Sequence, residues 1–253
     1  MDFDSKRAGT GTMEWAEVTE NITLGCANGC LYCYAAHNAD RFGTKPRSEW
    51  TKEEFTKRVN MTTYSPREGV IMFPASHDIT PFNITEYTRV AKLILEQGNK
   101  LLIVSKPRIE CMCTLANELG EWKDNILFRF TIGSIHSDEC AFWEPGAPSP
   151  EERVVSLKYM YSEGFKTSVS IEPMLEGSIE ALQVVEVVDP YVTDTIWIGK
   201  MNKVQLRVSI EHADRISEIA EMQSDVEIKA LYSALKNHPK IRWKDSINAV
   251  INR

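Results

Sequence analysis

Three cysteines, Cys26, Cys30 and Cys33, lie within eight consecutive residues of the segment GCANGCLYCY. Thiolates are soft ligands that suit iron-sulfur clusters, zinc or copper(I), and Gly29 allows the tight turn that lets three of them converge. Three ligands are one short of four. A four-iron cluster held by three cysteines keeps one iron open to a small molecule, whereas structural zinc requires a fourth protein ligand. The spacing therefore favours an open cluster.

Two alternatives stand beside the cluster. His37 follows Cys33 by four residues and could complete a zinc site, which would make the chain a zinc-stabilised binding module without catalysis. The thiols could also be small buried apolar groups. The remaining cysteines are Cys111, Cys113 and Cys140, and in a chain of this size such bunching indicates metal or redox chemistry rather than disulfides.

Length and composition limit the class of protein. The chain has 253 residues, of which 43% are hydrophobic and 26% charged, as in a globular protein that folds on its own. Its net charge of −7 excludes a protein that coats nucleic-acid duplexes in general, although it allows a local basic groove. No apolar run approaches the roughly 20 residues of a membrane span, and residues 1–6 are too polar for a signal peptide. We expect a cytoplasmic protein without membrane contact.

Short β-rich runs alternate with longer helical patterns, as in repeated βα units around a parallel sheet. The six expected strands are 18–24, 69–75, 100–105, 126–132, 166–171 and 195–198. The expected helices are 51–59, 84–97, 109–119, 150–162 and 178–188, with a long helical region over 212–237. Ser149 before Pro150 predicts a helix start, and Gly164 a helix end.

Six βα units are fewer than the eight of a closed barrel, so their number favours an α/β fold of the partial (β/α)6 TIM type. We expect one domain, residues 1–253, with a βα core over 14–205 and a C-terminal helical extension over 206–253. The cysteine segment follows the first strand. It therefore falls at the carboxyl ends of the strands, where βα folds place their sites.

The C-x3-C-x2-C pattern after the first strand, with Tyr32 before the last cysteine, resembles the radical S-adenosylmethionine (SAM) superfamily. That resemblance implies a four-iron four-sulfur (4Fe-4S) cluster whose open iron takes the amino and carboxylate groups of SAM. It implies that an electron from the cluster cleaves SAM to a 5′-deoxyadenosyl radical, which abstracts hydrogen from a substrate. It also implies an external one-electron reductant of the flavodoxin or ferredoxin type.

A narrower resemblance extends over most of the chain. Residues 105–107, 129–131, 143–153 and 170–173 resemble the spore photoproduct lyase-like group, which is also described as DNA repair photolyase-like. The resemblance implies a nucleobase, nucleoside or nucleic acid as the substrate, and lyase, isomerase or modification chemistry.

The same resemblance suggests residues that hold SAM. Ser76, Lys106, and Thr131 or Ser134 match the positions after strands two, three and four, and Tyr32 would lie against the adenine. Chemically, a lysine suits the SAM carboxylate, and hydroxyls suit the ribose. The alternative for the polar residues is that they close surface loops, and for Tyr32 that it is a packing aromatic.

Three further side chains follow strands and are candidates for the site. Glu172, before a proline, is a candidate SAM or substrate contact, and His77 is a candidate acid-base group or substrate contact. Lys200 follows the sixth strand and is a candidate cofactor contact. The alternatives are a structural strand end for Glu172, a turn cap for His77 and a solvated loop for Lys200.

One departure from the lyase group bears on the chemistry. Spore photoproduct lyase carries a hydrogen-donating cysteine just after the second strand, but residues 73–78 here read FPASHD. We therefore take Cys140, after the fourth strand, as the candidate hydrogen donor, and we do not expect repair of thymine dimers. Glu144 and Arg153 are expected to form a buried ion pair.

Overall fold

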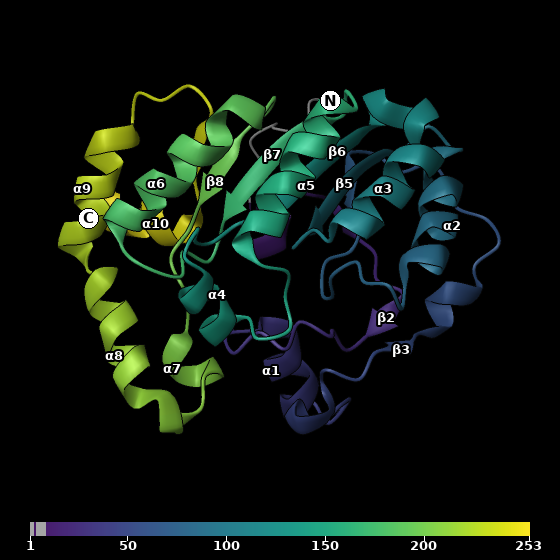
Figure 1. Ribbon diagram of the computed structural model, residues 1–253. Coiled ribbons are helices and arrows are strands. Elements are labelled where there is room, and N and C mark those ends of the chain that lie inside the picture. The colour runs from purple at the N-terminus through teal and green to yellow at the C-terminus, as the bar shows by residue number, and fades with distance from the viewer. Residues whose placement is uncertain (1–2, 4–8) are drawn as a thin grey trace.

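A computed structural model describes residue 3 and residues 9–253. Seven parallel strands form one sheet that curls into an open barrel (Figure 1). In sheet order they are β1 (Val18–Thr19), β4 (Val70–Met72), β5 (Lys100–Ser105), β6 (Ile126–Thr131), β7 (Lys166–Ile171), β8 (Ile196–Ile198) and β9 (Ile241–Trp243). All six pairings between neighbours are parallel. The partial (β/α)6 barrel expected from the sequence is thereby confirmed, with one additional strand.

The two faces of the sheet have different coverings because successive side chains of a strand point to opposite sides. On β5, Leu101 and Ile103 belong to the main core with the helices, whereas Leu102 belongs to a second cluster that also contains Trp15. The helices packed along the outer face are α2 (Ile84–Leu95), α3 (Ile109–Glu118), α5 (Pro150–Ser162) and α6 (Ser178–Val188) (Figure 1).

The outer layer continues beside α6 and β9 with α9 (Asp225–Leu235) and α10 (Asp245–Ile251), whose apolar side chains belong to the main core. The other helices are α1 (Tyr34–Arg41), α4 (Ser137–Trp143), α7 (Val204–Arg207) and α8 (Ala213–Met222). Short 3-10 helices cover Gly11–Glu14, Arg47–Glu49, Lys57–Asn60, Gly120–Asn125, Asp189–Tyr191 and Ile210–His212. A small antiparallel sheet pairs β2 (Thr23–Leu24) with β3 (Glu54–Phe55).

Three expectations about these elements are wrong. Residues 18–24 do not form one strand, because Val18–Thr19 pairs with β4 in the large sheet and Thr23–Leu24 pairs with β3 in the small one. Residues 51–59 do not form an α-helix, because Glu54–Phe55 pairs with Thr23–Leu24 and the Arg58 guanidinium binds the Glu20 carboxylate. The extension after residue 205 is not only helical, because β9 pairs with β8 and adds the seventh strand. The predicted helix start is confirmed, since the Ser149 hydroxyl accepts a hydrogen bond from the Glu152 amide.

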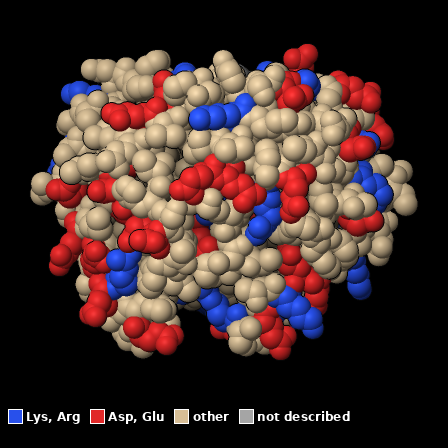
Figure 2. Space-filling model, in the orientation of Figure 1, with Lys and Arg blue, Asp and Glu red and all other residues tan. Residues whose placement is uncertain are grey.

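Charged side chains are interspersed on the surface. Figure 2 shows acidic and basic groups mixed over one face, without a continuous basic stripe on that face. Within the described residues, no helix is both long enough and apolar enough to cross a bilayer. The polar segment 1–6, on which we based the absence of a signal peptide, lies outside the described residues except for residue 3.

Candidate active site at the open end of the barrel

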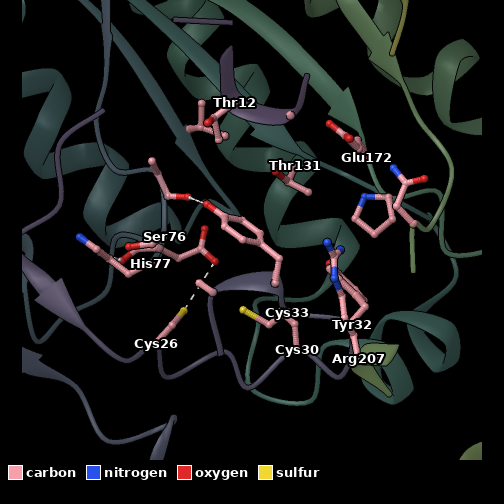
Figure 3. A pocket seen from close by; sticks show the side chains of 18 of the residues that line it. Thr12, Cys26, Cys30, Tyr32, Cys33, Ser76, His77, Thr131, Glu172 and Arg207 are labelled. Carbon is pink, nitrogen blue, oxygen red and sulfur yellow. Dashed lines mark hydrogen bonds between the residues drawn. The ribbon is translucent and has the colours of Figure 1, made fainter. Parts of the chain in front are cut away.

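A cavity of about 600 Å³ opens at the carboxyl ends of the parallel strands. This volume lies within the range of small-molecule sites. The cysteine segment forms one side of the cavity, and residues that follow β4 to β8 form the others (Figure 3). The predicted site residues that line it are Cys26, Cys30, Tyr32, Cys33, Ser76, His77, Lys106, Thr131, Glu172 and Lys200.

The backbone of the cysteine segment is held in a fixed shape. Gly29 has φ 57°, a left-handed conformation that glycine adopts without strain. Arg47, from the following loop, donates hydrogen bonds to the carbonyl oxygens of Cys30 at 3.2 Å, Leu31 at 2.6 Å and Cys33 at 3.4 Å. One guanidinium thus ties together three carbonyl groups of the turn that carries the thiols.

The thiols suit a cluster in number and kind. Cys26, Cys30 and Cys33 are all free and line the same cavity. Burial raises the pKa of Cys30 to about 12 and raises that of Cys26 above its usual value, so both need a nearby cation to become thiolates. Among the described residues, no three histidine, cysteine or acidic side chains already converge on one metal position. His37, the zinc alternative, is on α1 and is not part of the cavity lining.

Asp78 links the cysteine segment to the strand ends. Its carboxylate accepts hydrogen bonds from the Asn28 side chain at 2.8 Å, the Ser105 hydroxyl at 2.9 Å and the Lys106 amide at 2.7 Å. The Cys26 sulfur lies 3.8 Å from the same carboxylate. Burial alone would raise the pKa of Asp78, but the Lys106 charge and these hydrogen bonds outweigh burial and lower it.

Lys106 lies between two carboxylates. Its Nζ is 3.7 Å from Asp78 and 3.8 Å from Glu144. Glu144 also forms the predicted ion pair with Arg153, which is confirmed, and both side chains are fully buried. Burial and the Glu144 charge raise the pKa of Tyr32, so its hydroxyl stays protonated and donates a hydrogen bond to Glu144. This network fixes Tyr32 in the cavity wall.

His77 is held by the backbone on both sides of its ring. Nδ1 lies 3.0 Å from the Asp78 carbonyl oxygen and therefore donates, while Nε2 accepts a hydrogen bond from the Ile22 amide at 3.4 Å. Burial lowers the pKa of His77 to about 4, so the ring is neutral. Both nitrogens are engaged, which favours a positioning role for His77 over proton transfer.

Glu172 forms the side of the cavity that continues from β7. Its carboxylate is 3.4 Å from Lys244 Nζ, and the same ammonium group binds Glu14 at 2.8 Å and the Gly11 carbonyl oxygen at 2.8 Å. A single positive charge is thus shared between two acids. Burial raises the pKa of Glu172 to about 7.

This shift predicts a pH-dependent cost of burying Glu172. Between its usual pKa of about 4.3 and 7, the folded chain keeps the proton while the unfolded chain loses it, so Glu172 makes folding less favourable as pH rises. We expect the stability of Glu172→Gln relative to the unaltered chain to increase by about 1–3 kcal/mol as the pH rises from 5 to 8. Urea unfolding across this range measures the difference. Glu186→Gln, an exposed change on α6, provides the control, and parallel profiles for the unaltered chain and the Glu172 variant would contradict the prediction.

Two predicted residues are not on the cavity wall. The Ser134 hydroxyl donates to the Glu176 carboxylate and accepts a hydrogen bond from the His136 amide at 2.8 Å. The Cys140 sulfur lies 3.7 Å from the Ser134 carbonyl oxygen, in the same apolar cluster as Cys30. Neither side chain belongs to the lining, so Thr131 rather than Ser134 is the polar residue that follows β6 into the cavity.

Sequence reasoning missed Arg47 and Arg207 and gave Asp78 too small a part. The Arg207 side chain comes from α7 and extends into the cavity (Figure 3). Its charge interacts with Cys33, Tyr34 and Glu172. No motif identifies either arginine, because each approaches the cysteines only through the tertiary packing of a short helix, Arg47–Glu49 or Val204–Arg207. Asp78 follows His77 after β4, and its position at a strand end was the available signal.

Comparison of sequences gives a distant relative. No family model matches this chain. The uncharacterised protein ORF301 of Acidianus two-tailed virus is 24% identical over 168 residues, which cover 61% of this chain and 54% of the viral protein. The chain thus spans about half the length of this curated relative.

Comparison of structures is more informative. Spore photoproduct lyase complexed with dinucleoside spore photoproduct superposes with a TM-score of 0.58 and 14% identity, over 94% of this chain and 79% of the lyase. A lyase variant with bound AdoMet, which is SAM, and dinucleoside spore photoproduct gives 0.56 and 14%, over 90% and 76%. SuiB of Streptococcus suis bound to SAM gives 0.50 and 10%, over 87% and 48%. The chain therefore has the fold of these spore photoproduct lyase structures, in agreement with the partial barrel that its six βα units predict.

Proposed function

We propose that the chain is a radical SAM enzyme that acts on a substrate held in the cavity. The observation that carries this proposal is the position of three free cysteines on one cavity, at the carboxyl ends of the parallel strands. Solved structures of the same fold are described with SAM bound. The number and kind of the thiols fit a four-iron cluster with one open iron.

Cys26, Cys30 and Cys33 would hold this 4Fe-4S cluster. When bound, the cluster would supply one-electron chemistry: with an electron from a flavodoxin- or ferredoxin-type reductant, SAM would be cleaved to methionine and a 5′-deoxyadenosyl radical that takes hydrogen from carbon. Arg47 fixes the turn through its three carbonyl contacts. Asp78 joins that turn to Ser105 and Lys106, so the cysteines and the ends of β4 and β5 form one rigid unit.

The other lining residues would bind and orient SAM and substrate. Tyr32 offers a ring face whose hydroxyl is fixed by Glu144, which suits stacking on adenine. Ser76 and Thr131 offer hydroxyl groups for the ribose, and Lys200 offers a cation. The wall of buried residues would exclude water from a reactive carbon radical. A role for Cys140 as hydrogen donor stays a prediction, since its thiol lies off this wall.

A nucleobase, nucleoside or nucleic acid is the substrate class that we propose. It is supported by the lyase structures of the same fold, which are described with a dinucleoside photoproduct. The chain lacks a thiol in residues 73–78, so a reaction other than the lyase repair step is favoured. Whether that reaction belongs to the lyase or the isomerase class is decided by its product.

The test is anaerobic reconstitution with iron and sulfide. We expect a brown protein with about four irons per chain, which forms 5′-deoxyadenosine when SAM and dithionite are added. A rise in that product on adding nucleosides or oligonucleotides, compared with peptides, would identify the substrate class.

Two results would contradict the proposal. A colourless protein with one zinc would support the binding module that uses His37, and loss of that zinc on His37→Ala would establish it. A four-iron protein that never forms 5′-deoxyadenosine would indicate electron transfer instead.

A further inference from the structure

The segment that follows β8 brings three cations to the cavity. Lys200 and Lys203 lie in the loop before α7, and Arg207 ends that helix. All three line the cavity that the cysteines also line. Figure 3 shows the Arg207 guanidinium extending from α7 past Cys33 toward the centre of the cavity.

These cations differ from Lys106, which also lines the cavity, in forming no ion pair. Lys106 pairs with Asp78 and Glu144, and the Lys244 charge is shared between Glu172 and Glu14. Within residue 3 and residues 9–253, Lys200, Lys203 and Arg207 form no ion pair, and the Arg207 guanidinium has no hydrogen-bond partner. The half-buried Arg207 guanidinium thus loses hydration without gaining a hydrogen bond or an ion pair, and its interaction with Glu172 acts over a longer distance.

We propose that Arg207, with Lys200 and Lys203 beside it, binds a carboxylate or phosphate group of a molecule in the cavity. A guanidinium presents paired N–H donors that match either group, and the two lysines add positive charge. Lys106 is less suited to this task because two carboxylates already neutralise it. The inference deepens the proposed function and rests on it for the choice of molecules.

The carboxylate of SAM and a phosphate of the substrate are the two sources of such a group, and paired probes separate them. S-adenosylhomocysteine carries the carboxylate, and 5′-methylthioadenosine lacks it. Thymidine 5′-monophosphate carries a phosphate, and thymidine lacks it. Isothermal titration measures all four probes with the unaltered full chain, with Arg207→Gln and Arg207→Lys, and with Arg253→Gln. The last variant makes the same charge change at an exposed terminal arginine.

We expect Arg207→Gln to weaken binding of at least one anionic probe about tenfold, with its neutral partner unchanged. Arg207→Lys should lose less affinity than Arg207→Gln, because lysine keeps the positive charge although it lacks the paired N–H donors. Arg253→Gln should bind the probes with the affinity of the unaltered chain. The probe pair whose anionic member loses affinity shows whether Arg207 binds the carboxylate of SAM or a phosphate of the substrate. Circular dichroism confirms that each variant is folded.

Three outcomes would overturn the inference. In the first, the unaltered chain binds neither anionic probe. In the second, the Arg207→Gln chain still prefers each anionic probe over its neutral partner as strongly as the unaltered chain does. In the third, Arg207→Gln weakens the binding of anionic and neutral probes equally. None of these measurements needs iron. A chain that holds no cluster yet discriminates the probes through Arg207 would therefore contradict the proposed function and support this inference.

Discussion

Replacing Cys30 by alanine is expected to remove the bound iron and to lower formation of 5′-deoxyadenosine by roughly a hundredfold or more. The reason is that, among the described residues, the thiols that line the cavity are Cys26, Cys30 and Cys33, so losing one leaves two protein ligands for the proposed cluster, which needs three. Iron analysis and the yield of 5′-deoxyadenosine after anaerobic reconstitution measure the two effects.

Cys113→Ala is the matched control. Cys113 is a half-buried cysteine on α3 and is not part of the cavity lining, so its loss should leave both the iron content and the product yield unchanged. A Cys30 variant that keeps four irons and full product yield would show that other groups hold the metal. Equal losses in both variants would point to general damage to the fold.

The fold was predictable wherever local pattern and tertiary packing agree. The helices Pro150–Ser162 and Ser178–Val188 have the predicted boundaries, because caps and apolar spacing are encoded within each segment. The strand Ile241–Trp243 was missed because it has three residues and follows a polar stretch. Only pairing with β8 makes those residues a strand.

The site was predictable from topology rather than from side-chain contacts. Parallel strands end at one edge, so Lys106, Thr131 and Glu172 could be assigned to a common mouth before any contact was known. The partners of these residues were not accessible in this way. Arg47 and Arg207 reach the cysteine segment from two short helices whose positions depend on the packing of the whole barrel. Sequence spacing holds no information about such approaches.

Glu144→Gln is expected to lower the free energy of unfolding by about 3–5 kcal/mol, which is the range for removing one partner of a buried ion pair. The change leaves Arg153 with a buried, uncompensated charge and removes one of the two carboxylates that balance Lys106. It also weakens the acceptor of the Tyr32 hydroxyl. Urea unfolding followed by circular dichroism measures the loss. Glu151→Gln, at the start of α5, is the control because its carboxylate is exposed, and it should change stability by less than about 1 kcal/mol.

A second variant separates the ion pair from its surroundings. If the uncompensated guanidinium causes the loss, the double variant Glu144→Gln, Arg153→Met should recover a large part of the stability, because no buried charge then lacks its partner at this position. Additive losses in the double variant would instead assign the effect to packing and to Lys106. The outcome also bears on the site, because Glu144 connects Arg153 to Lys106 and Tyr32. If the unaltered chain binds SAM as proposed and a stable double variant does not, the main role of this pair is to position the cavity wall and not to stabilise the fold.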